Sequence, residues 1–440
     1  MTEHFFSVPK DYSNPSSGNI KLFARSVRKH DTAADPSTTT ENNAKQLPWM
    51  VYLQGGPGMS CRSPQSYPFT STLLDKGYQI LFLDQRGTGL STPVTPSTLG
   101  LRGPNDVQAK YLKLYRADNI VRDCEAIRLA LTSSFAANKR KWSIMGQSFG
   151  GFISLSYLSF YPEGLVESFI YGGLQPLVHE PDDVYRRLYR KVLQRNEAYY
   201  AKYPEDIARV KTVVRYLRRF GDGTIKLPSE GKLTARRFLQ MGINLGFHGG
   251  VDAVHEVVLK AAADVADFGH LTRGTLSAIE KSAPFDDHLI YSVLHEPIYC
   301  NGKAPRWAAE RIMKEYPQFN VDVDGDGNEM VCFTGEMVYS WMFEDYSELR
   351  KVADVAERVS RDEDWPPLWD EEQLAKNEVP VYAAAYVEDM YVDHELSRET
   401  AKKVKGCKMF ETNIMYHNAL GEKSKEVVEQ LFAFRDDVID

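Results

Sequence analysis

The chain has 440 residues, of which 43% are hydrophobic and 26% are charged, and its formal net charge at pH 7 is −7. Its composition is typical of a globular protein, and its length allows one large α/β domain with an insertion or two to three average domains. The net negative charge and the absence of a basic run argue against a nucleic-acid partner. No apolar stretch approaches the ~20 residues that span a bilayer, which argues against a membrane protein.

The cysteines and the N-terminus indicate the compartment. The five cysteines are scattered and odd in number, which favours reduced thiols over a disulfide framework or a zinc site. The segment Met1–Phe6 lacks a basic region followed by an apolar core, so we expect no signal peptide. These features predict a cytoplasmic protein, and no sequence feature indicates its oligomeric state.

The N-terminal part predicts an edge hairpin followed by a central strand. Residues 4–12 and 20–28 read as two strands, the second partly alternating apolar and polar side chains as an antiparallel edge strand does. Residues 31–46 carry no apolar period and are interpreted as a surface loop without function. Pro48–Leu53 is an apolar run that predicts a buried strand.

Two loops follow buried strands in this part of the chain. Gln54–Gly58 reads Gln-Gly-Gly-Pro-Gly and comes directly after the strand at 48–53. Such a turn is ordinary by itself, but glycines after a central strand also let backbone N–H groups approach a ligand. The second strand, Tyr78–Leu83, ends in Asp84-Gln-Arg-Gly-Thr-Gly-Leu-Ser91, in which we expect Asp84 and Arg86 to hold a loop beside the site.

The stretch Gly146-Gln-Ser-Phe-Gly-Gly151 carries the strongest chemical signal. A helical pattern at 119–131 and a short apolar strand at 141–145 precede it, and an apolar helix at 152–161 follows it. Strand, G-x-S-x-G and helix in that order predict a nucleophile elbow, with Ser148 exposed on a strained turn. In such a site the oxyanion is held by backbone N–H groups, which we assign to Gly56 and Phe149.

The remaining chain predicts an α/β-hydrolase fold with an inserted cap. With a strand at 167–173, the order of elements so far predicts a doubly wound, mostly parallel sheet. Amphipathic helices follow, and no parallel-strand signal returns until 378–386. We therefore expect a catalytic domain formed by residues 1–176 and 376–440, and a helical cap domain formed by residues 177–375.

The other members of a catalytic triad are expected after the cap, in the order Ser, Asp, His. Asp389 follows the strand at 378–386, where α/β sheets place their sites, and Glu388 and Asp393 are its competitors. His417 is the histidine that follows the next strand, at 407–412. His394 is the rival, but it lies too close to Asp389 in the chain to come from a separate loop.

No metal or cofactor is expected. Asp322–Asn328 copies the first half of an EF-hand calcium loop, but the twelfth position, which should be a bidentate glutamate, is Phe333. Four histidines lie in the predicted cap region without a recognised ligand spacing: His248, His255, His288 and His295.

The combination of these motifs resembles the proline iminopeptidases, also called prolyl aminopeptidases, and most closely their longer microbial branch of about 50 kDa. The resemblance rests on the segments 54–58, 84–91, 146–151 and 388–392. The departures are Gln54, where many relatives have histidine, and Phe149, where many have tryptophan. The resemblance implies a serine exopeptidase whose partners are short peptides with an N-terminal proline.

The resemblance also implies a site for the protonated imino group of the substrate. Family members bind this group with cap glutamates near aromatic side chains, and Glu296 and Glu336 stand in such surroundings. A buried cation needs carboxylate partners, which agrees with that role. With Phe149, the aromatic side chains of Tyr299, Trp341 and Phe343 are candidates to line a slot for the pyrrolidine ring.

Three alternatives remain open at this stage. A capped serine esterase or amidase would keep the triad without needing the two glutamates. An aminopeptidase of broader specificity would need the glutamates but accept other side chains. A non-catalytic binding protein on the same fold would usually have lost a member of the triad, whereas Ser148, Asp389 and His417 are all present.

Overall fold

The computed structural model describes residues 1–29, 47–220, 223–321 and 330–437. Its centre is an eight-stranded sheet in the order β1-β2-β4-β3-β5-β6-β7-β8, in which β1, β2 and β4 pair antiparallel and all other neighbours pair parallel. The strands are β1 Thr2–Pro9, β2 Asn19–Val27, β3 Trp49–Leu53, β4 Gln79–Asp84, β5 Trp142–Gln147, β6 Leu165–Tyr171, β7 Val381–Tyr386 and β8 Cys407–Thr412. The doubly wound, mostly parallel sheet expected from the sequence is confirmed.

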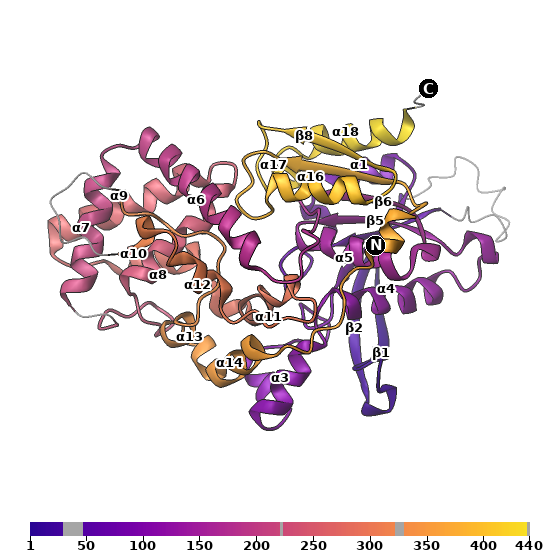
Figure 1. The fold of residues 1–440 in the computed structure, drawn as a ribbon, viewed down its shortest axis with the longest axis horizontal. Helices are drawn as coiled ribbons and strands as arrows, with labels where there is room; N and C mark the ends of the chain where they lie inside the picture. The colour runs from indigo at the N-terminus through magenta and orange to yellow at the C-terminus, as the bar shows by residue number, and fades with distance from the viewer. Residues whose placement is uncertain (30–46, 221–222, 322–329, 438–440) are drawn as a thin grey trace.

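Helices cover both faces of the sheet because successive strand side chains point to opposite sides. Met50 and Tyr52 of β3 belong to the core under α1 and α18, whereas Val51 and Leu53 belong to the core on the other face. Figure 1 shows α4 and α5 on that other face, where α15 and α16 also pack. These helices are α1 Phe69–Asp75, α4 Ala117–Leu131, α5 Phe149–Phe160, α15 Glu371–Ala375, α16 His394–Lys403 and α18 Ser424–Asp436.

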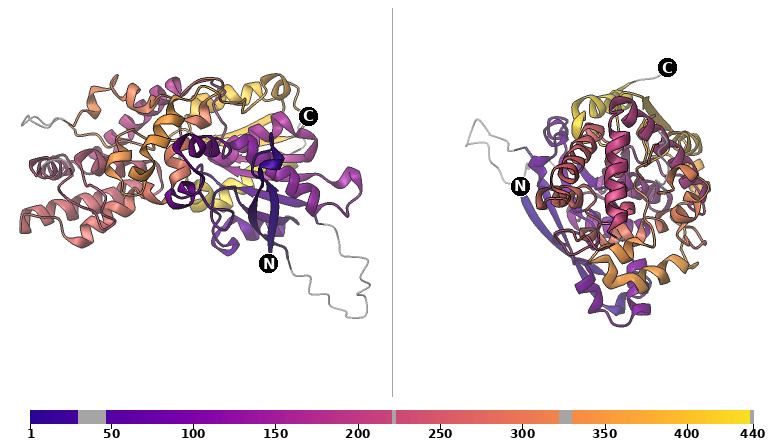
Figure 2. Two further views of the ribbon diagram at one scale, coloured as in Figure 1. Left: turned by 90° about the horizontal axis from the view of Figure 1, so that it is seen from below. Right: turned by 90° about the vertical axis from the view of Figure 1, so that its left-hand side faces the viewer.

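The chain between β6 and β7 forms a second lobe of helices, which projects to the left in Figure 1 and is seen end-on in the right view of Figure 2. We call this lobe the cap. α15 lies within the expected cap range but packs against α5. The cap helices are α6 Asp182–Lys202, α7 Asp206–Arg219, α8 Ala235–Leu239, α9 Gly250–Phe268, α10 Arg273–Ser282, α11 Leu289–Leu294, α12 Ala308–Met313, α13 Met342–Asp345 and α14 Ala353–Arg361.

Shorter elements complete the chain. Two small helices, α2 Pro96–Gly100 and α3 Asn105–Lys113, follow β4, and α17 Ala419–Glu422 precedes α18. The 3-10 helices are η1 Pro15–Ser17, η3 Pro64–Ser66, η4 Ala137–Lys139, η5 Pro162–Gly164, η6 Gln240–Gly246, η7 Phe285–Asp287, η8 Pro297–Tyr299, η9 Pro317–Phe319 and η10 Leu349–Val352. The surface loop expected at 31–46 and the calcium-like segment at 322–328 lie outside the described residues.

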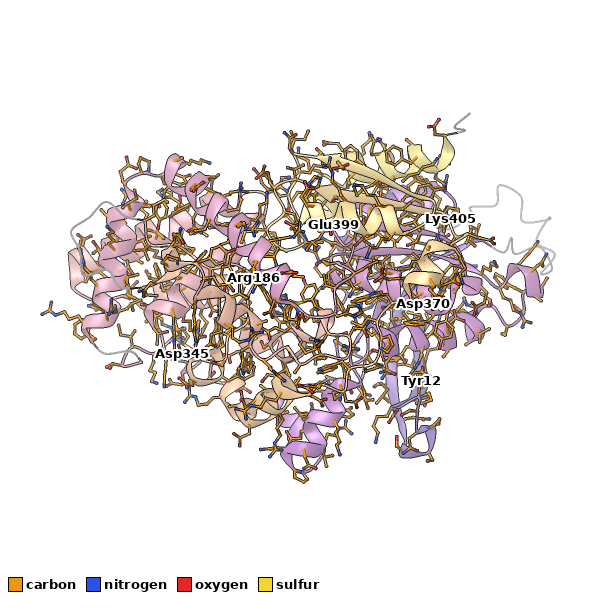
Figure 3. All side chains as sticks on the ribbon, viewed as in Figure 1. Tyr12, Arg186, Asp345, Asp370, Glu399 and Lys405 are labelled. Carbon is orange, nitrogen blue, oxygen red and sulfur yellow. The ribbon has the colours of Figure 1, made fainter. Side chains whose placement is uncertain are left out.

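Buried contacts join the cap to the sheet domain. The fully buried guanidinium of Arg116, just before α4, donates hydrogen bonds to the carbonyls of Pro297 (2.9 Å) and Cys300 (2.8 Å) in the cap. Ile290 of α11 packs so closely on a sheet-domain loop that a Cβ at Gly87 would lie 2.4 Å from its Cδ1. At the rim, Arg187 of α6 pairs with Glu399 of α16 at 3.1 Å, and Figure 3 labels Glu399 where the two lobes meet.

Candidate active site

Ser148 lies on a strained turn between β5 and α5, as the elbow pattern predicts. Its backbone has φ 54° and ψ −124°, an unfavourable conformation for a residue with a side chain. The neighbouring glycines are required by close packing of the backbone. A Cβ at Gly150 would lie 1.9 Å from the carbonyl oxygen of Leu53, and one at Gly151 would lie 2.3 Å from that of Gly173. The turn therefore fixes the serine at the carboxyl end of the central strand.

The structure brings Ser148, His417 and Asp389 into one hydrogen-bonded chain. His417 Nε2 lies 3.0 Å from Ser148 Oγ, and its Nδ1 lies 2.6 Å from Asp389 Oδ2. The serine comes from the β5–α5 turn, the aspartate from the loop after β7, and the histidine from the loop after β8. These are the residues that the sequence predicts, and the distances are those of a nucleophile, a base and an orienting carboxylate.

Asp389 is held in place by backbone donors. Its Oδ1 accepts hydrogen bonds from the N–H groups of Tyr391 (2.8 Å) and Val392 (3.0 Å), and the residue is fully buried. The competing residues serve other contacts. Asp393 caps α16 by accepting from the Leu396 N–H at 2.9 Å, and His394 pairs with Glu411 at 2.6 Å.

The surroundings of His417 favour its protonated form. Burial alone would lower its pKa, but the charge and hydrogen bond of Asp389, together with the charge of Glu336, raise the pKa above the usual value. The ring of Tyr391 packs against the imidazole with centroids 4.6 Å apart. An imidazolium formed during proton transfer from Ser148 would thus be stabilised by two carboxylates.

Two backbone N–H groups are available for an oxyanion. Phe149 opens α5, so its N–H has no acceptor within the helix. The Gly56 N–H donates to no residue of the described chain. The loop that carries Gly56 touches the nucleophile, because a Cβ at Gly55 would lie 3.1 Å from Ser148 Cβ and 3.6 Å from its Oγ.

The loop after β4 is fixed by buried charges, as the sequence predicts. Asp84 accepts hydrogen bonds of 2.9 Å from the N–H groups of Cys61 and Leu90. Arg86 makes two hydrogen bonds of 2.7 Å to the Asp123 carboxylate, which also accepts from Tyr12 at 2.8 Å (Figure 3 labels Tyr12). These groups hold the loops around the site.

Glu336 places a buried carboxylate of the cap close to the triad. Its Oε2 lies 3.4 Å from His295 Nε2 and 3.4 Å from Tyr291 Oη. His295 is itself positioned by Tyr185, whose Oη lies 3.2 Å from its Nδ1. The charge of Glu336 acts on His417, which ties this carboxylate to the reaction centre electrostatically.

Glu296 is buried in the cap and starts a helix. Its Oε1 accepts a hydrogen bond of 2.9 Å from the Ala309 N–H in the first turn of α12. Burial raises the pKa of Glu296 to about 8, although the α12 N–H groups and Arg311 act in the opposite direction. Glu296 and Glu336 both act electrostatically on Tyr185, so the two carboxyl groups border one region of the cap.

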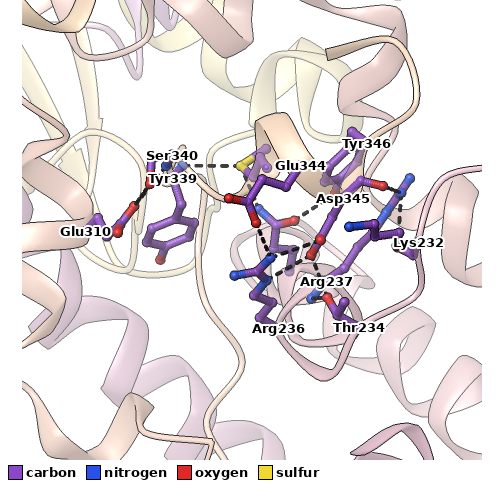
Figure 4. Close-up of polar contacts among 12 residues, drawn as sticks. Lys232, Thr234, Arg236, Arg237, Glu310, Tyr339, Ser340, Glu344, Asp345 and Tyr346 are labelled. Atoms are coloured by element: carbon purple, nitrogen blue, oxygen red, sulfur yellow. Dashed lines mark hydrogen bonds and ion pairs between the residues drawn. The ribbon is translucent and has the colours of Figure 1, made fainter. Parts of the chain in front are cut away.

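Helix α12 connects the segments that carry the two glutamates. Beyond its contact with Glu296, it contributes Glu310, which accepts hydrogen bonds from the Ser340 N–H (2.9 Å) and Oγ (2.6 Å). Figure 4 shows these contacts beside a second anchor, in which Asp345 binds Arg236 at 2.9 and 3.0 Å. The segment that follows Glu336 is therefore fixed at two points.

The aromatic residues expected around the substrate separate into two groups. Tyr299 packs edge-to-face on Phe152 at 5.7 Å, and Phe152 contacts Phe149 at 6.1 Å, so Tyr299 lies in a buried aromatic cluster that begins beside the nucleophile. Trp341 instead stacks on Tyr339 at 5.3 Å, and Phe343 contacts Trp307 at 5.5 Å. The described ring contacts do not join Trp341 or Phe343 to the triad, so their place in the site stays a sequence-based prediction.

Sequence reasoning missed several residues of this region. Tyr291 and His295 contact the Glu336 carboxylate, Tyr185 contacts His295, and Tyr391 packs on His417. His295 directly precedes Glu296 in the sequence, and this position could have identified His295 as a site residue. A search for metal-ligand spacings does not detect it.

The described residues contain no group of three or more His, Cys, Asp or Glu side chains that could hold a metal ion. Among the helices of the described ranges, none combines the length and the apolar character that a membrane crossing demands.

The sheet order, the elbow and the triad define a member of the α/β hydrolases, and the model of the alpha/beta hydrolase fold family matches residues 48–423. The proline iminopeptidase aneH of Aspergillus aculeatus is 46% identical over 439 residues, which cover 100% of this chain and 94% of that protein. The proline iminopeptidase of Aeromonas sobria is 36% identical over 435 residues, covering 99% and 96% respectively. The chain therefore belongs to the proline iminopeptidase family, which confirms the resemblance drawn from its motifs.

A comparison with solved structures finds a proline iminopeptidase at low similarity. The proline iminopeptidase of Mycobacterium smegmatis is 14% identical to this chain, covers 99% of it and 100% of its own length, and has a TM-score of 0.42. This likeness carries no part of the functional argument.

Proposed function

We propose that this protein is a serine aminopeptidase that releases N-terminal proline from short peptides. Its membership of the proline iminopeptidase family supports this activity, since both full-length relatives bear that name. The single observation that carries the proposal is the Glu336 carboxylate, which is buried in the cap against His295 and Tyr291 and contributes to the raised pKa of His417. An esterase needs only the triad carboxylate of Asp389 near its histidine, whereas an enzyme that binds a protonated imino group needs a further buried carboxylate.

In the proposed reaction, His417 Nε2 takes the proton of Ser148 Oγ as this oxygen attacks the prolyl carbonyl carbon. Asp389 keeps Nδ1 protonated and stabilises the imidazolium. The N–H groups of Gly56 and Phe149 hold the oxyanion, a contribution whose loss typically costs about 10²–10³ in rate. The C–N bond then breaks, and His417 returns the proton to the leaving amine. Water attacks the prolyl ester next and releases proline and Ser148, so no cofactor is required.

The imino group is assigned to Glu336 and Glu296 in the cap. Glu336 supplies a buried carboxylate that contacts Tyr291 and His295. Glu296 is largely neutral at pH 7 before substrate arrives, because its pKa is raised to about 8, and an adjacent cation would favour its ionised form. Tyr299, with Phe149, forms the proposed wall for the pyrrolidine ring.

We assign a different function to each of the two lobes. Residues 1–176 and 376–440 form the catalytic domain in this proposal, and residues 177–375 form the cap domain that binds the N-terminus. In this proposal, buried aromatic and carboxylate groups close the part of the site that binds the N-terminal proline. Chains that extend beyond the N-terminal residue are therefore excluded. This arrangement favours an exopeptidase over an endopeptidase.

The decisive experiment measures kcat and KM with the 4-nitroanilides of proline, alanine and leucine and with 4-nitrophenyl acetate. We expect proline anilide to be the preferred substrate and Ser148→Ala to lower every rate by at least about 10⁴. Glu336→Gln should reduce kcat/KM for proline anilide by at least tenfold while affecting the acetyl ester much less. Glu344→Gln is the matched control, because Glu344 is an exposed acid on the same segment.

Each alternative predicts a different result in this experiment. Ester turnover without anilide turnover would favour a capped esterase or amidase. Equal turnover of all three anilides would favour an aminopeptidase of broad specificity. Proline turnover that survives Ser148→Ala would overturn the proposed mechanism.

A further inference from the structure

The cap holds an open cleft of about 220 Å³ that none of the proposed roles uses. One wall comes from η6 and the residues after it, the other from the end of α10 through α11, and Met59 of the sheet domain contributes to the lining. The lining is mainly apolar, with half-buried Met59, Ile243 and Phe247 beside buried Ala283 and Phe285. Pockets for drug-sized ligands begin at about 300 Å³, so this cleft has room for one large side chain rather than a whole peptide.

Four contacts place this cleft next to the reaction centre. Phe247 stacks on Tyr391 with ring centroids 5.0 Å apart, and Tyr391 packs on His417 at 4.6 Å. The Tyr391 hydroxyl also donates to the carbonyl of Ile243, another residue of the cleft. On the opposite side, Tyr291 lines the cleft and contacts the Glu336 carboxylate.

The oxyanion loop provides the fourth contact. A Cβ at Gly56 would lie 3.0 Å from the Met59 nitrogen and 3.1 Å from its Cγ, so Met59 bridges the proposed oxyanion donor and the cleft.

The two walls of the cleft are already joined to each other in this structure. The Asn244 side chain donates to the carbonyls of Met241 (2.9 Å) and Ser282 (2.8 Å), which ties its two walls together.

The polar groups of the cleft suit an anion. Lys281 is exposed, and no ion pair to an acid is found for it within the described ranges. His288 is the other titratable base in the lining, and burial, which outweighs the charge of Asp287, lowers its pKa. At neutral pH the cleft therefore presents one cation, Lys281, at the edge of an apolar surface.

We propose that this cleft binds the residue that follows the N-terminal proline, with a preference for a large apolar side chain, and that Lys281 binds the carboxylate of a dipeptide. The inference rests on the proposed function. The acyl side of the site is closed by buried groups such as Tyr299 and Glu336, so the leaving part of the peptide must occupy an open side. His417 must protonate the leaving amine, and the cleft adjoins His417 through Tyr391. A dipeptide of proline and phenylalanine or leucine fits both its apolar surface and its cation.

The test compares kcat/KM for Pro-Phe, Pro-Gly, Pro-Phe-amide and prolinamide. Prolinamide releases only ammonia and places nothing in the cleft, so it reports on the proline side alone. We expect the wild type to prefer Pro-Phe over Pro-Gly by at least tenfold, as burial of a large apolar group allows. Ile243→Thr, which replaces apolar surface with a hydroxyl, should reduce the ratio of Pro-Phe to prolinamide turnover severalfold.

A separate variant tests the proposed contact between Lys281 and the carboxylate of the dipeptide. Lys281→Ala should lower kcat/KM for Pro-Phe about threefold to fivefold, the effect of an exposed ion pair, and this loss should be absent with Pro-Phe-amide. Lys402→Ala, which changes an exposed lysine of α16, is the matched control and should leave all four substrates unaffected.

The outcomes separate this inference from the function on which it rests. If neither prolinamide nor any dipeptide is hydrolysed, the proposed function fails and the cleft assignment fails with it. If prolinamide is hydrolysed but the wild type does not distinguish Pro-Phe from Pro-Gly, only the cleft assignment is overturned. It is also overturned if Ile243→Thr lowers prolinamide turnover as much as that of Pro-Phe. Equal loss with Pro-Phe and Pro-Phe-amide in Lys281→Ala would remove the carboxylate contact.

Discussion

The carboxyl group of Glu296 accepts a hydrogen bond of 2.9 Å from the Ala309 N–H, and this contact begins helix α12. A group in this position stabilises the cap whether or not substrate is present. Because burial raises its pKa to about 8, its charge state changes within the physiological range. In the proposed reaction, binding of a protonated imino group beside Glu296 would therefore be linked to release of a proton from the cap.

This linkage predicts how stability depends on pH. A carboxyl group with a raised pKa in the folded state contributes stability that is fully present below its unfolded pKa and is lost as pH rises toward about 8. A tenfold change in proton affinity corresponds to about 1.4 kcal/mol, so the loss should amount to several kcal/mol. Glu296→Gln keeps an acceptor for the Ala309 N–H but does not titrate. The free energy of unfolding of Glu296→Gln should therefore increase relative to that of the wild type as the pH rises from 5 to 8.

Urea denaturation at pH 5, 6, 7 and 8 measures this difference. Glu429→Gln, an exposed glutamate of α18, is the control and should show the same difference at each pH. A constant difference between wild type and Glu296→Gln from pH 5 to pH 8 would contradict the prediction.

The charge of Glu336 predicts a change in the pH dependence of catalysis. This charge raises the pKa of His417, whose neutral form must accept the serine proton. Glu336→Gln removes the charge, so the pKa of His417 should fall and the acidic limb of the kcat/KM profile should move to lower pH. An acyl ester without an amino group isolates this effect from amine binding. An acidic limb that stays in place would show that Glu336 does not act on His417.

The contact between Gly55 and Ser148 predicts a loss of activity without a loss of fold. A Cβ at Gly55 would lie 3.1 Å from Ser148 Cβ and 3.2 Å from the Gln147 carbonyl oxygen, so the nucleophile must move to accommodate it. Gly55→Ala should lower kcat by about 10²-fold, because small misplacements of reacting groups are costly. The melting temperature should change little. Gly421→Ala, where a Cβ would meet nothing within 4 Å, is the control.

The parts of the site that follow from local signals could be predicted from the sequence. The elbow around Ser148 is a strand, a turn and a helix in succession, and Asp389 and His417 each follow a strand directly. Their separation in the chain does not matter, because carboxyl ends of parallel strands meet at one edge of the sheet.

The cap was harder to predict, because its contacts join distant segments without a periodic pattern. Among the amphipathic segments of the cap, the one that begins as helix α8 is an α-helix only to Leu239 and continues as the 3-10 helix η6. There Gly242 lies so close to the chain that a Cβ would be 2.1 Å from the Thr334 carbonyl oxygen. The contact of His295 with Glu336 likewise depends on how the cap folds, and no spacing in the sequence encodes it.

The packing of Ile290 between the cap and the sheet domain predicts a strong dependence of stability on this one side chain. Ile290 is 3% exposed, and its atoms lie where a Cβ at Gly58 or Gly87 would collide with them. Ile290→Ala should reduce the free energy of unfolding by about 2–5 kcal/mol, while Ile290→Val should cost only about 0.5–1.5 kcal/mol. Because α11 also carries Tyr291, which contacts Glu336, Ile290→Ala should raise KM for proline anilide more than KM for the acetyl ester. Chemical denaturation and steady-state kinetics measure both effects. A stability loss for alanine no larger than that for valine would mean that Ile290 does not hold the lobes together.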